Sequence, residues 1–266
     1  MKANGPVTEN AGCPADPSGE SPPAHRVELI SFDSSEALAQ AAAARWLAEL
    51  SLARRQTVAL SGGRIAKMFF AAIVRLARTE SPPFANLHFF WADERGVPPD
   101  HADSNFALAR AHLLEPLGIP AEQTHRVHGE LEPSAAAAKA SAELGRLAAR
   151  RGAGQPILDW IFLGMGEDGH VASLFPGTSD SEAEVAPAYL AVTAPKPPPR
   201  RITFSYPALA AARQVWVLVS GPGKERALAE SLSPTGQTPL ARVVRSRGST
   251  LIFSDVHLPA DGPKKI

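Results

Sequence analysis

His170 is the residue of this sequence best placed to carry chemistry, because of the segment that surrounds it. It lies in Leu163–Gly177, which reads LGMGEDGHVASLFPG and follows an apolar run at 157–163 that predicts a buried strand. Asp168 precedes it by two residues. An imidazole with an unperturbed pKa of about 6.5 suits proton transfer near neutral pH, and a neighbouring carboxylate can orient it or favour its protonated form. Two glycines beside this pair allow tight turns and close backbone approach to a ligand: Gly166 and Gly169.

Two other chemistries are disfavoured at this segment. No second histidine or cysteine stands at a metal-ligand spacing from His170, so the sequence predicts no metal site there. Ser173 is a conceivable nucleophile, but the G-x-S-x-G turn that exposes a catalytic serine is absent. Most of the other histidines, such as His112 and His125, lack a glycine scaffold and are expected to be solvated.

A second candidate is the tripeptide Ser61-Gly62-Gly63, at the end of a predicted strand and just before a predicted helix. Glycines in such a turn free backbone amides to face an anion, and the helix dipole adds partial positive charge. An ordinary tight strand–helix turn would have the same sequence, so the tripeptide alone leaves phosphate binding open.

Charged residues supply two further candidates. Asp93-Glu94-Arg95 ends a buried strand; the acids could accept hydrogen bonds from sugar hydroxyls, and Arg95 could clamp an anion or hold its acidic neighbours. A solvated charge cluster is the alternative. Several cations would suit a phosphate, although each taken singly is typical of scattered surface charge: Lys196, Arg200, Arg201 and Lys224.

Alternating strands and helices must position these residues. Strands are expected at 27–32, 57–60, 87–91, 157–163, 189–193, 202–205, 215–220 and 250–253, and helices at 35–50, 65–78, 106–114, 134–150 and from 224 onward. Several strands are continuous apolar runs, which is typical of parallel sheets buried on both faces. The fold class predicted is therefore α/β, with a mostly parallel, doubly wound sheet and helices on both faces. Ligands bind such sheets at the carboxyl ends of the strands.

Composition bounds the domain organisation and the partners. The proline-rich residues 1–25 predict a disordered tail, and 26–266 a single domain. The charge balances at 27 basic against 27 acidic residues, which predicts neither nucleic-acid binding nor a membrane anchor. Cys13 has no second cysteine to pair with, no apolar run reaches the length of a membrane span, and no secretory signal is evident, so a cytoplasmic location is expected. Monomer and dimer both remain open.

The motifs together resemble the 6-phosphogluconolactonase family. The resemblance is carried by SGG at 61–63, FFWADERGVPPDHADSN at 89–105, LGMGEDGHVASLFPG at 163–177 and KPPPRRITFSYPAL at 196–209, with a weaker block, GPGKERAL, at 221–228. It implies a fold like that of the glucosamine-6-phosphate deaminases, which are similar in the glycine turn and the G-x-D-G-H segment. Those deaminases continue with F-N-E-P-G, whose glutamate takes part in ring opening; here the chain reads SLFPG, which favours the lactonase.

The resemblance also implies an activity and a set of site residues. The activity is hydrolysis of 6-phosphoglucono-1,5-lactone in the pentose phosphate pathway, without metal or organic cofactor. His170 would be the general base and Asp168 would orient it, while amides of the glycine turns, including Gly166 and Gly169, would face the substrate. Asp93 and Arg95 would frame the sugar. The phosphate would be held by five residues carried over from the family pattern: Ser61, Gly62, Gly63, Arg201 and Lys224.

One departure from the family pattern concerns the phosphate turn. The family's S-G-G-S-T-P is replaced here by a segment with Arg64, Ile65 and Ala66 after the glycines. We expect Arg64 to supply a charged donor where the family has neutral hydroxyls. The change also leaves open that the chain is a sugar-phosphate binding protein without turnover. The shared fold leaves open a second alternative, a deaminase-like isomerase.

Overall fold

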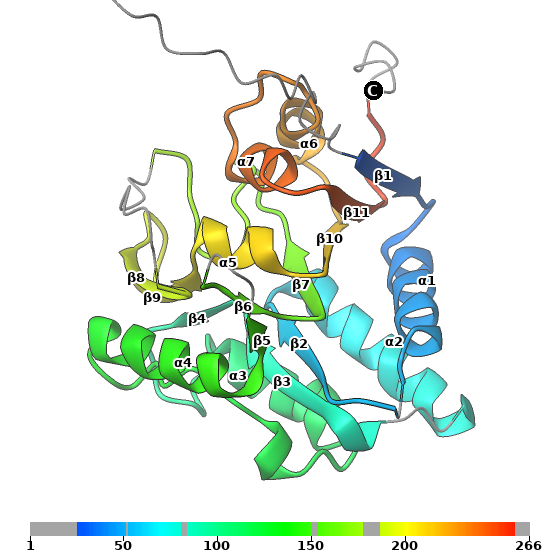
Figure 1. The fold of residues 1–266 in the computed structure, drawn as a ribbon. Coiled ribbons are helices and arrows are strands. Elements are labelled where there is room, and N and C mark those ends of the chain that lie inside the picture. Colours follow the sequence, from blue (N-terminus) through cyan, green and yellow to red (C-terminus); the bar gives the residue numbers. More distant parts are fainter. Residues whose placement is uncertain (1–25, 52, 81–83, 151–153, 178–186, 259–266) are drawn as a thin grey trace, which may run out of the picture.

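The chain is built around a six-stranded sheet in which every neighbouring pair of strands is parallel (Figure 1). The computed structural model describes residues 26–51, 53–80, 84–150, 154–177 and 187–258. The strand order is β1-β11-β10-β7-β2-β3. The strands are β1 (Arg26–Ser31), β2 (Gln56–Leu60), β3 (Leu87–Trp91), β7 (Trp160–Gly164), β10 (Gln214–Val219) and β11 (Ser249–Ser254). The interior strand β2 is buried throughout, as its apolar sequence predicts for a sheet covered on both faces.

Helices cover both faces of this sheet, which confirms the predicted fold class. Helices α1 and α2 pack against each other on one face, and α5 and α7 lie on the other (Figure 1). The Ser34 hydroxyl accepts a hydrogen bond from the backbone N–H of Ala37 and so begins α1. The helices are α1 (Ser35–Ala48), α2 (Arg64–Glu80), α3 (Asn105–Ala109), α4 (Pro133–Leu147), α5 (Tyr206–Ala211), α6 (Glu225–Ser231) and α7 (Pro239–Arg245). Short 3-10 turns occupy Phe84–Asn86 and Ala121–Gln123.

A second, antiparallel sheet lies beside the main one and was not expected from the sequence. It has the order β4-β9-β8, formed by β4 (Asp93–Arg95), β9 (Arg200–Phe204) and β8 (Tyr189–Thr193). Strand β4 is only three residues long and consists of charges, so no alternating pattern marked it as a strand. Because Ala92 and Asp93 directly follow Trp91, the chain passes from the main sheet into the second sheet within two residues.

Two predicted helices end differently from their sequence patterns. The segment expected as a helix at 106–114 is α3 followed by a π-helical turn at Arg110–Leu114. The helix expected to reach residue 150 ends at Leu147, and β5 (Ala149–Arg150) then pairs with β6 (Pro156–Ile157). The tail at 1–25 lies outside the described residues. Within the described part of the chain, no helix is both long and apolar enough to cross a membrane.

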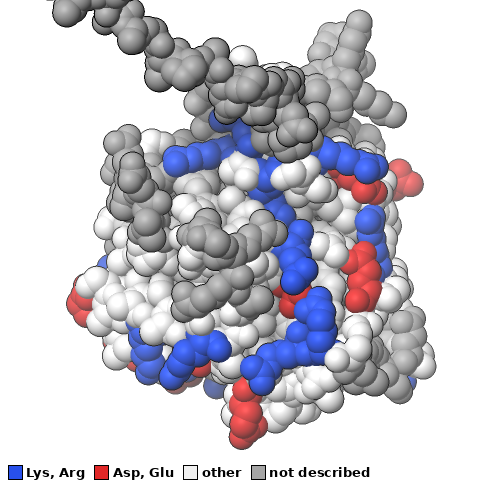
Figure 2. Space-filling model, in the orientation of Figure 1, with Lys and Arg blue, Asp and Glu red and all other residues white. Residues whose placement is uncertain are grey.

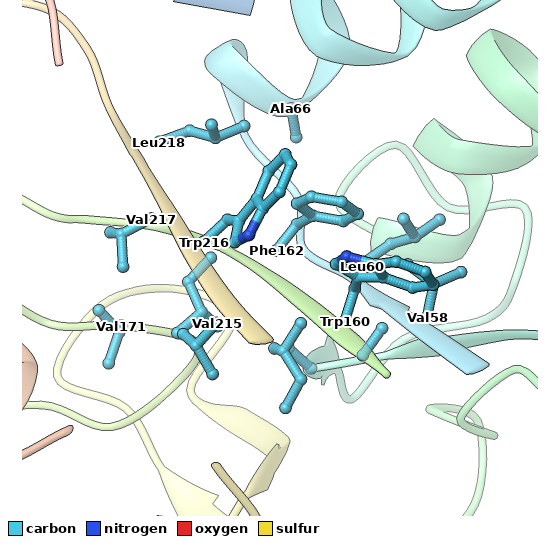
Figure 3. Close-up of a cluster of buried hydrophobic side chains, with 14 of the residues drawn as sticks. Val58, Leu60, Ala66, Trp160, Phe162, Val171, Val215, Trp216, Val217 and Leu218 are labelled. Atoms are coloured by element: carbon cyan, nitrogen blue, oxygen red, sulfur yellow. The ribbon is translucent and has the colours of Figure 1, made fainter. Parts of the chain in front are cut away.

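The buried core fixes the strands whose ends carry the candidate site. The ring of Phe162 lies 5.6 Å from Trp216 and 4.8 Å from Phe69, measured between centroids, so aromatic side chains join β7 and β10 to α2. Figure 3 shows the Phe162 and Trp216 rings on one side of the strands and Val171, Val215 and Val217 on the other. Val171 is fully buried, so the residue that follows His170 is anchored in the core.

The balanced net charge hides an uneven surface. On the face drawn in Figure 2, lysine and arginine side chains form a band down the middle, while acidic side chains are few and scattered. The balanced net charge therefore coexists with a local excess of positive charge on this face.

Candidate active site

A cavity of about 470 Å³ opens at the carboxyl ends of β2, β7 and β10. This is the edge at which parallel α/β sheets bind ligands, because the loops after several strands converge there. The β4 strand closes one side of the cavity, through Asp93 and Arg95. Most of the predicted site residues line it: Ser61, Gly62, Gly63, Arg64, Asp93, Arg95, Gly166, His170 and Lys224.

His170 is held from two sides. Its Nδ1 lies 2.5 Å from Oδ1 of Asp168, and its ring lies 4.5 Å from the ring of Phe175, between centroids. The second oxygen of Asp168 lies 3.2 Å from Nζ of Lys196. Because the carboxylate accepts a hydrogen bond from the Nδ1–H group, the ring proton stays on Nδ1 and the Nε2 lone pair is left available for a reacting proton. No described residue makes a hydrogen bond to Nε2.

The charge state of Asp168 is set by these partners. Burial alone would raise the pKa of this carboxyl, but the hydrogen bond and the positive charge from His170, together with the His170 backbone N–H and Lys196, outweigh burial. They lower the pKa of Asp168 to about 2. The carboxylate is therefore ionised at any pH at which an imidazole can act as a base.

Gly166 leaves the space in which the imidazole sits. A Cβ at this position would lie 2.0 Å from Nδ1 of His170 and 2.7 Å from Oδ1 of Asp168. No side chain fits there without displacing the pair. The sequence motif G-x-D-G-H thus has a steric reason for its first glycine.

Asp93 is fixed in the cavity wall by buried donors. The Ser173 hydroxyl donates to Oδ2 at 2.6 Å, and Nδ2 of Asn105 lies 3.2 Å from Oδ1 and 2.9 Å from the Asp93 carbonyl oxygen. Ser173 is fully buried. Since its hydroxyl is committed to Asp93, the structure offers no support for Ser173 as a nucleophile.

Glu94 does not face the cavity, although its sequence position allowed a role in sugar binding. It is buried, and its carboxylate accepts hydrogen bonds from the backbone N–H groups of Asn105 and Phe106 and from the Ser104 hydroxyl. It therefore holds the start of α3 against β4. The acid at the end of β3 that remains available to a ligand is Asp93.

Cations meet on the opposite side of the cavity. The Arg64 guanidinium lies against Gly221, where a Cβ would be 2.2 Å from Nη2. Burial, and next the charge of Arg64, lower the pKa of Lys224, because the nearby carboxylates of Asp255 and Glu167 do not compensate. An anion bound between the two cations would relieve this shortage of negative charge.

Three predicted site residues lie outside the cavity lining. Asp168 sits behind His170, as an orienting residue requires. The Cα of Gly169 faces Thr238, since a Cβ there would lie 2.7 Å from that side chain. The Arg201 guanidinium is buried and donates from Nε to the Pro198 carbonyl at 2.6 Å and from Nη2 to the Pro197 carbonyl at 3.2 Å. Arg201 thus braces the proline loop, and it is not among the residues that line the cavity.

Sequence reasoning missed the residues that support the site. The sequence makes Lys196 a phosphate-binding candidate, but its ammonium pairs with Asp168. Asn105 and Phe175 lie within the motifs that carry the family resemblance, but the sequence does not indicate which residues they contact. His125 was expected in solvent; instead Nε2 lies 2.8 Å from Nδ1 of His88, and Nδ1 lies 2.8 Å from Glu143. In the described part of the chain, no group of three His, Cys, Asp or Glu side chains could hold a metal ion.

Replacing Asn105 by alanine is expected to destabilise the fold. Asn105 is 3% exposed, and its Oδ1 fills the space beside Gly62, where a Cβ would lie 1.8 Å away. The change leaves the Asp93 carbonyl and carboxylate short of a buried donor, so the free energy of unfolding should fall by about 1–3 kcal/mol. Urea unfolding followed by circular dichroism measures it. An unchanged midpoint with an unchanged slope would contradict the role assigned to Asn105.

Comparison with known proteins decides the family. Residues 33–252 match the family model for glucosamine-6-phosphate isomerases/6-phosphogluconolactonase. A probable chloroplastic 6-phosphogluconolactonase 3 of Oryza sativa subsp. indica is 38% identical over 247 residues, which cover 85% of this chain and 73% of the rice protein. The chain belongs to the 6-phosphogluconolactonase family. Trypanosoma brucei 6-phosphogluconolactonase has a solved structure with a TM-score of 0.75 at 28% identity, covering 87% of this chain and 97% of that one.

The likeness to a solved deaminase structure supports the fold alone. A monomeric glucosamine-6-phosphate deaminase superposes with a TM-score of 0.73 at 18% identity, over 85% of this chain and 97% of the deaminase. The family match confirms the resemblance that the motifs indicate. Members of the lactonase family are hydrolases. The sequence SLFPG after Ala172, in place of the deaminase F-N-E-P-G, agrees with this assignment.

Proposed function

We propose that this chain hydrolyses 6-phosphoglucono-1,5-lactone to 6-phosphogluconate, with His170 as the general base. The observation that carries the proposal is the His170–Asp168 pair, joined at 2.5 Å in the wall of the cavity with Nε2 left unpaired. The family of the chain, whose relatives carry the lactonase name, supports the choice of substrate.

The proposed reaction uses one residue in two steps. Nε2 of His170 removes a proton from a water molecule, whose oxygen attacks the lactone carbonyl carbon. The tetrahedral intermediate then collapses with cleavage of the bond to the ring oxygen. His170, now an imidazolium stabilised by the ionised Asp168, returns the proton to that oxygen. The products are a carboxylic acid and a hydroxyl, and the base is regenerated.

The oxyanion of the intermediate needs hydrogen-bond donors, and the glycine turns differ in whether their backbone N–H groups already donate to another group. The N–H of Gly166 donates to the His170 carbonyl at 2.9 Å, and that of Gly169 donates to the Gly166 carbonyl at 3.0 Å. Both are used inside their own loop. Among the described residues, the amides of Gly62 and Gly63 donate to no other group. We assign the oxyanion or the phosphate to these two amides.

The phosphate is assigned to the side of the cavity formed by Arg64, Lys224 and the start of α2. The Ser61 hydroxyl donates to the Phe162 carbonyl at 2.8 Å, so it ties β2 to β7 and contributes an acceptor rather than a free donor. After the glycines, where the family pattern has hydroxyls, this chain has Arg64, and we assign the phosphate contact to its guanidinium. Asp93, on the opposite wall, is assigned to the sugar hydroxyls.

Alanine at Arg64 or Lys224 is expected to weaken substrate binding without changing the chemical step. Loss of one charge-assisted contact to the phosphate should raise KM for the lactone about tenfold and leave kcat within about twofold. Arg78→Ala, an exposed arginine at the far end of the same helix, is the matched control and should leave both constants unchanged. A fall in kcat with KM unchanged would place Arg64 and Lys224 outside the phosphate site.

Substrate choice separates the proposal from its alternatives. Purified protein is offered freshly generated lactone and, separately, glucosamine 6-phosphate, with ammonia release followed for the latter. The proposal predicts lactone hydrolysis and no ammonia. Ammonia release would support the isomerase, and 6-phosphogluconate binding without turnover of either compound would support a binding protein.

A further inference from the structure

A second cavity of about 390 Å³ adjoins the active site at the start of α2. The two cavities share Gly63, Arg64 and Arg95 in their linings. Nothing lies within 4 Å of the position that a Cβ on Gly63 would occupy, so the space above this residue is open between them. We call this second cavity the α2 shelf.

The α2 shelf is lined by more cations than anions. Arg64 and Lys67 stand one turn apart on α2, and Arg95 comes from β4. Asp103 is the only carboxylate among the described lining residues, and its side chain lies 3.7 Å from His101 rather than on a lysine or arginine. In the described part of the chain, Arg64 and Lys67 form no ion pair.

Arg95 has donor capacity left over for a ligand. Its Nη1 donates to the Asp103 carbonyl at 2.8 Å, while its Nε is buried without a hydrogen-bond partner among the described groups. The Nη2 group of Arg95 makes no hydrogen bond to any described group and is not among the buried unpaired atoms, so its N–H groups can pair with an anion on the shelf or at its border with the active site.

We propose that the α2 shelf is a second anion subsite, and that the active site together with the shelf binds a diphosphate group. One phosphate would occupy the side formed by Arg64 and Lys224, and the adjoining phosphate would cross the open space above Gly63 to Arg95 and Lys67. The ligand class is a compound with two linked phosphates, such as a nucleoside diphosphate or a dinucleotide. Such a ligand would compete with the lactone, because it takes Arg64. The inference rests on the proposed function, which assigns the first phosphate.

Inorganic pyrophosphate and orthophosphate are the probes. Each is titrated into the full chain by calorimetry at fixed pH and ionic strength without divalent metal, and each is then tested as an inhibitor of lactone hydrolysis. The wild-type protein should bind pyrophosphate at least about tenfold more tightly than orthophosphate, and pyrophosphate should inhibit competitively. Lys67→Ala should lose about fivefold in pyrophosphate affinity, keep its orthophosphate affinity, and keep KM and kcat for the lactone.

Lys139→Ala, an exposed lysine on α4, is the matched control for lost charge and should bind pyrophosphate like the wild type. Equal affinity for the two probes, or equal losses of pyrophosphate affinity in the Lys67 and Lys139 variants, would overturn the proposal that the α2 shelf binds an anion. The two proposals fail separately: absence of lactone turnover refutes the proposed function, while calorimetry still reports on the shelf.

Discussion

His170→Ala should reduce kcat for lactone hydrolysis by about 10²–10⁴-fold while the protein still folds and binds 6-phosphogluconate. The loss is large because this one imidazole performs both proton transfers, and no other described side chain in the cavity is a histidine. Folding should survive because the side chain is partly exposed at the cavity wall, whereas its neighbour Val171 carries the core contact. Initial rates corrected for spontaneous opening, with calorimetry of product binding, measure both parts.

His257→Ala provides the matched control, since this histidine is exposed and lies outside the cavity lining. Its rate should equal that of the wild type. A His170→Ala protein that is folded and turns over within a few-fold of the wild type would remove His170 from its role.

Asp168→Asn is the second large effect we expect, also about 10²–10⁴-fold in kcat with KM little changed. An asparagine removes the charge that stabilises the imidazolium. Its Nδ2 can also donate to Nδ1, which would place the ring proton on Nε2 and block the base. Because the pKa of Asp168 is lowered to about 2, the ionised form is the one present throughout the neutral range, and its loss should be felt at every pH in that range.

Lys196→Ala separates orientation of the ring from charge at the carboxylate. It removes the partner of the second Asp168 oxygen and leaves the 2.5 Å contact to His170 in place. We expect less than a tenfold fall in kcat, because the Lys196 side chain is about half exposed and its ion pair is screened by solvent. Equal losses in the two variants would mean that Asp168 acts through Lys196 and not by orienting the imidazole.

The main sheet could be predicted because its strands are written in the sequence as apolar runs. Runs such as 57–60 and 215–220 are buried on both faces, and each is followed by a glycine turn and a helix. Strand order could not be predicted, since parallel neighbours are fixed by packing across the sheet. The antiparallel sheet was missed because β4 is three charged residues, and its partners are known only once β9 is placed beside it.

Site residues could be predicted where the residues that interact in the structure lie within one short sequence motif. His170, Asp168 and Gly166 interact within five residues of chain, so their spacing in the sequence determines how they are arranged in the site. Asn105, Ser173 and Arg201 act through partners far away in sequence or through carbonyl groups, neither of which leaves a local pattern. Charge alone misled in the case of Glu94, whose carboxylate caps a helix that the sequence indicated only one residue later.

The most direct test of the account is the rate at which the purified wild-type chain opens freshly prepared 6-phosphogluconolactone. Product is followed through a coupled 6-phosphogluconate dehydrogenase, and the spontaneous rate is subtracted. We expect turnover that is proportional to enzyme concentration, saturates with lactone and falls about 10²–10⁴-fold in His170→Ala. A wild-type rate no faster than spontaneous opening would contradict it.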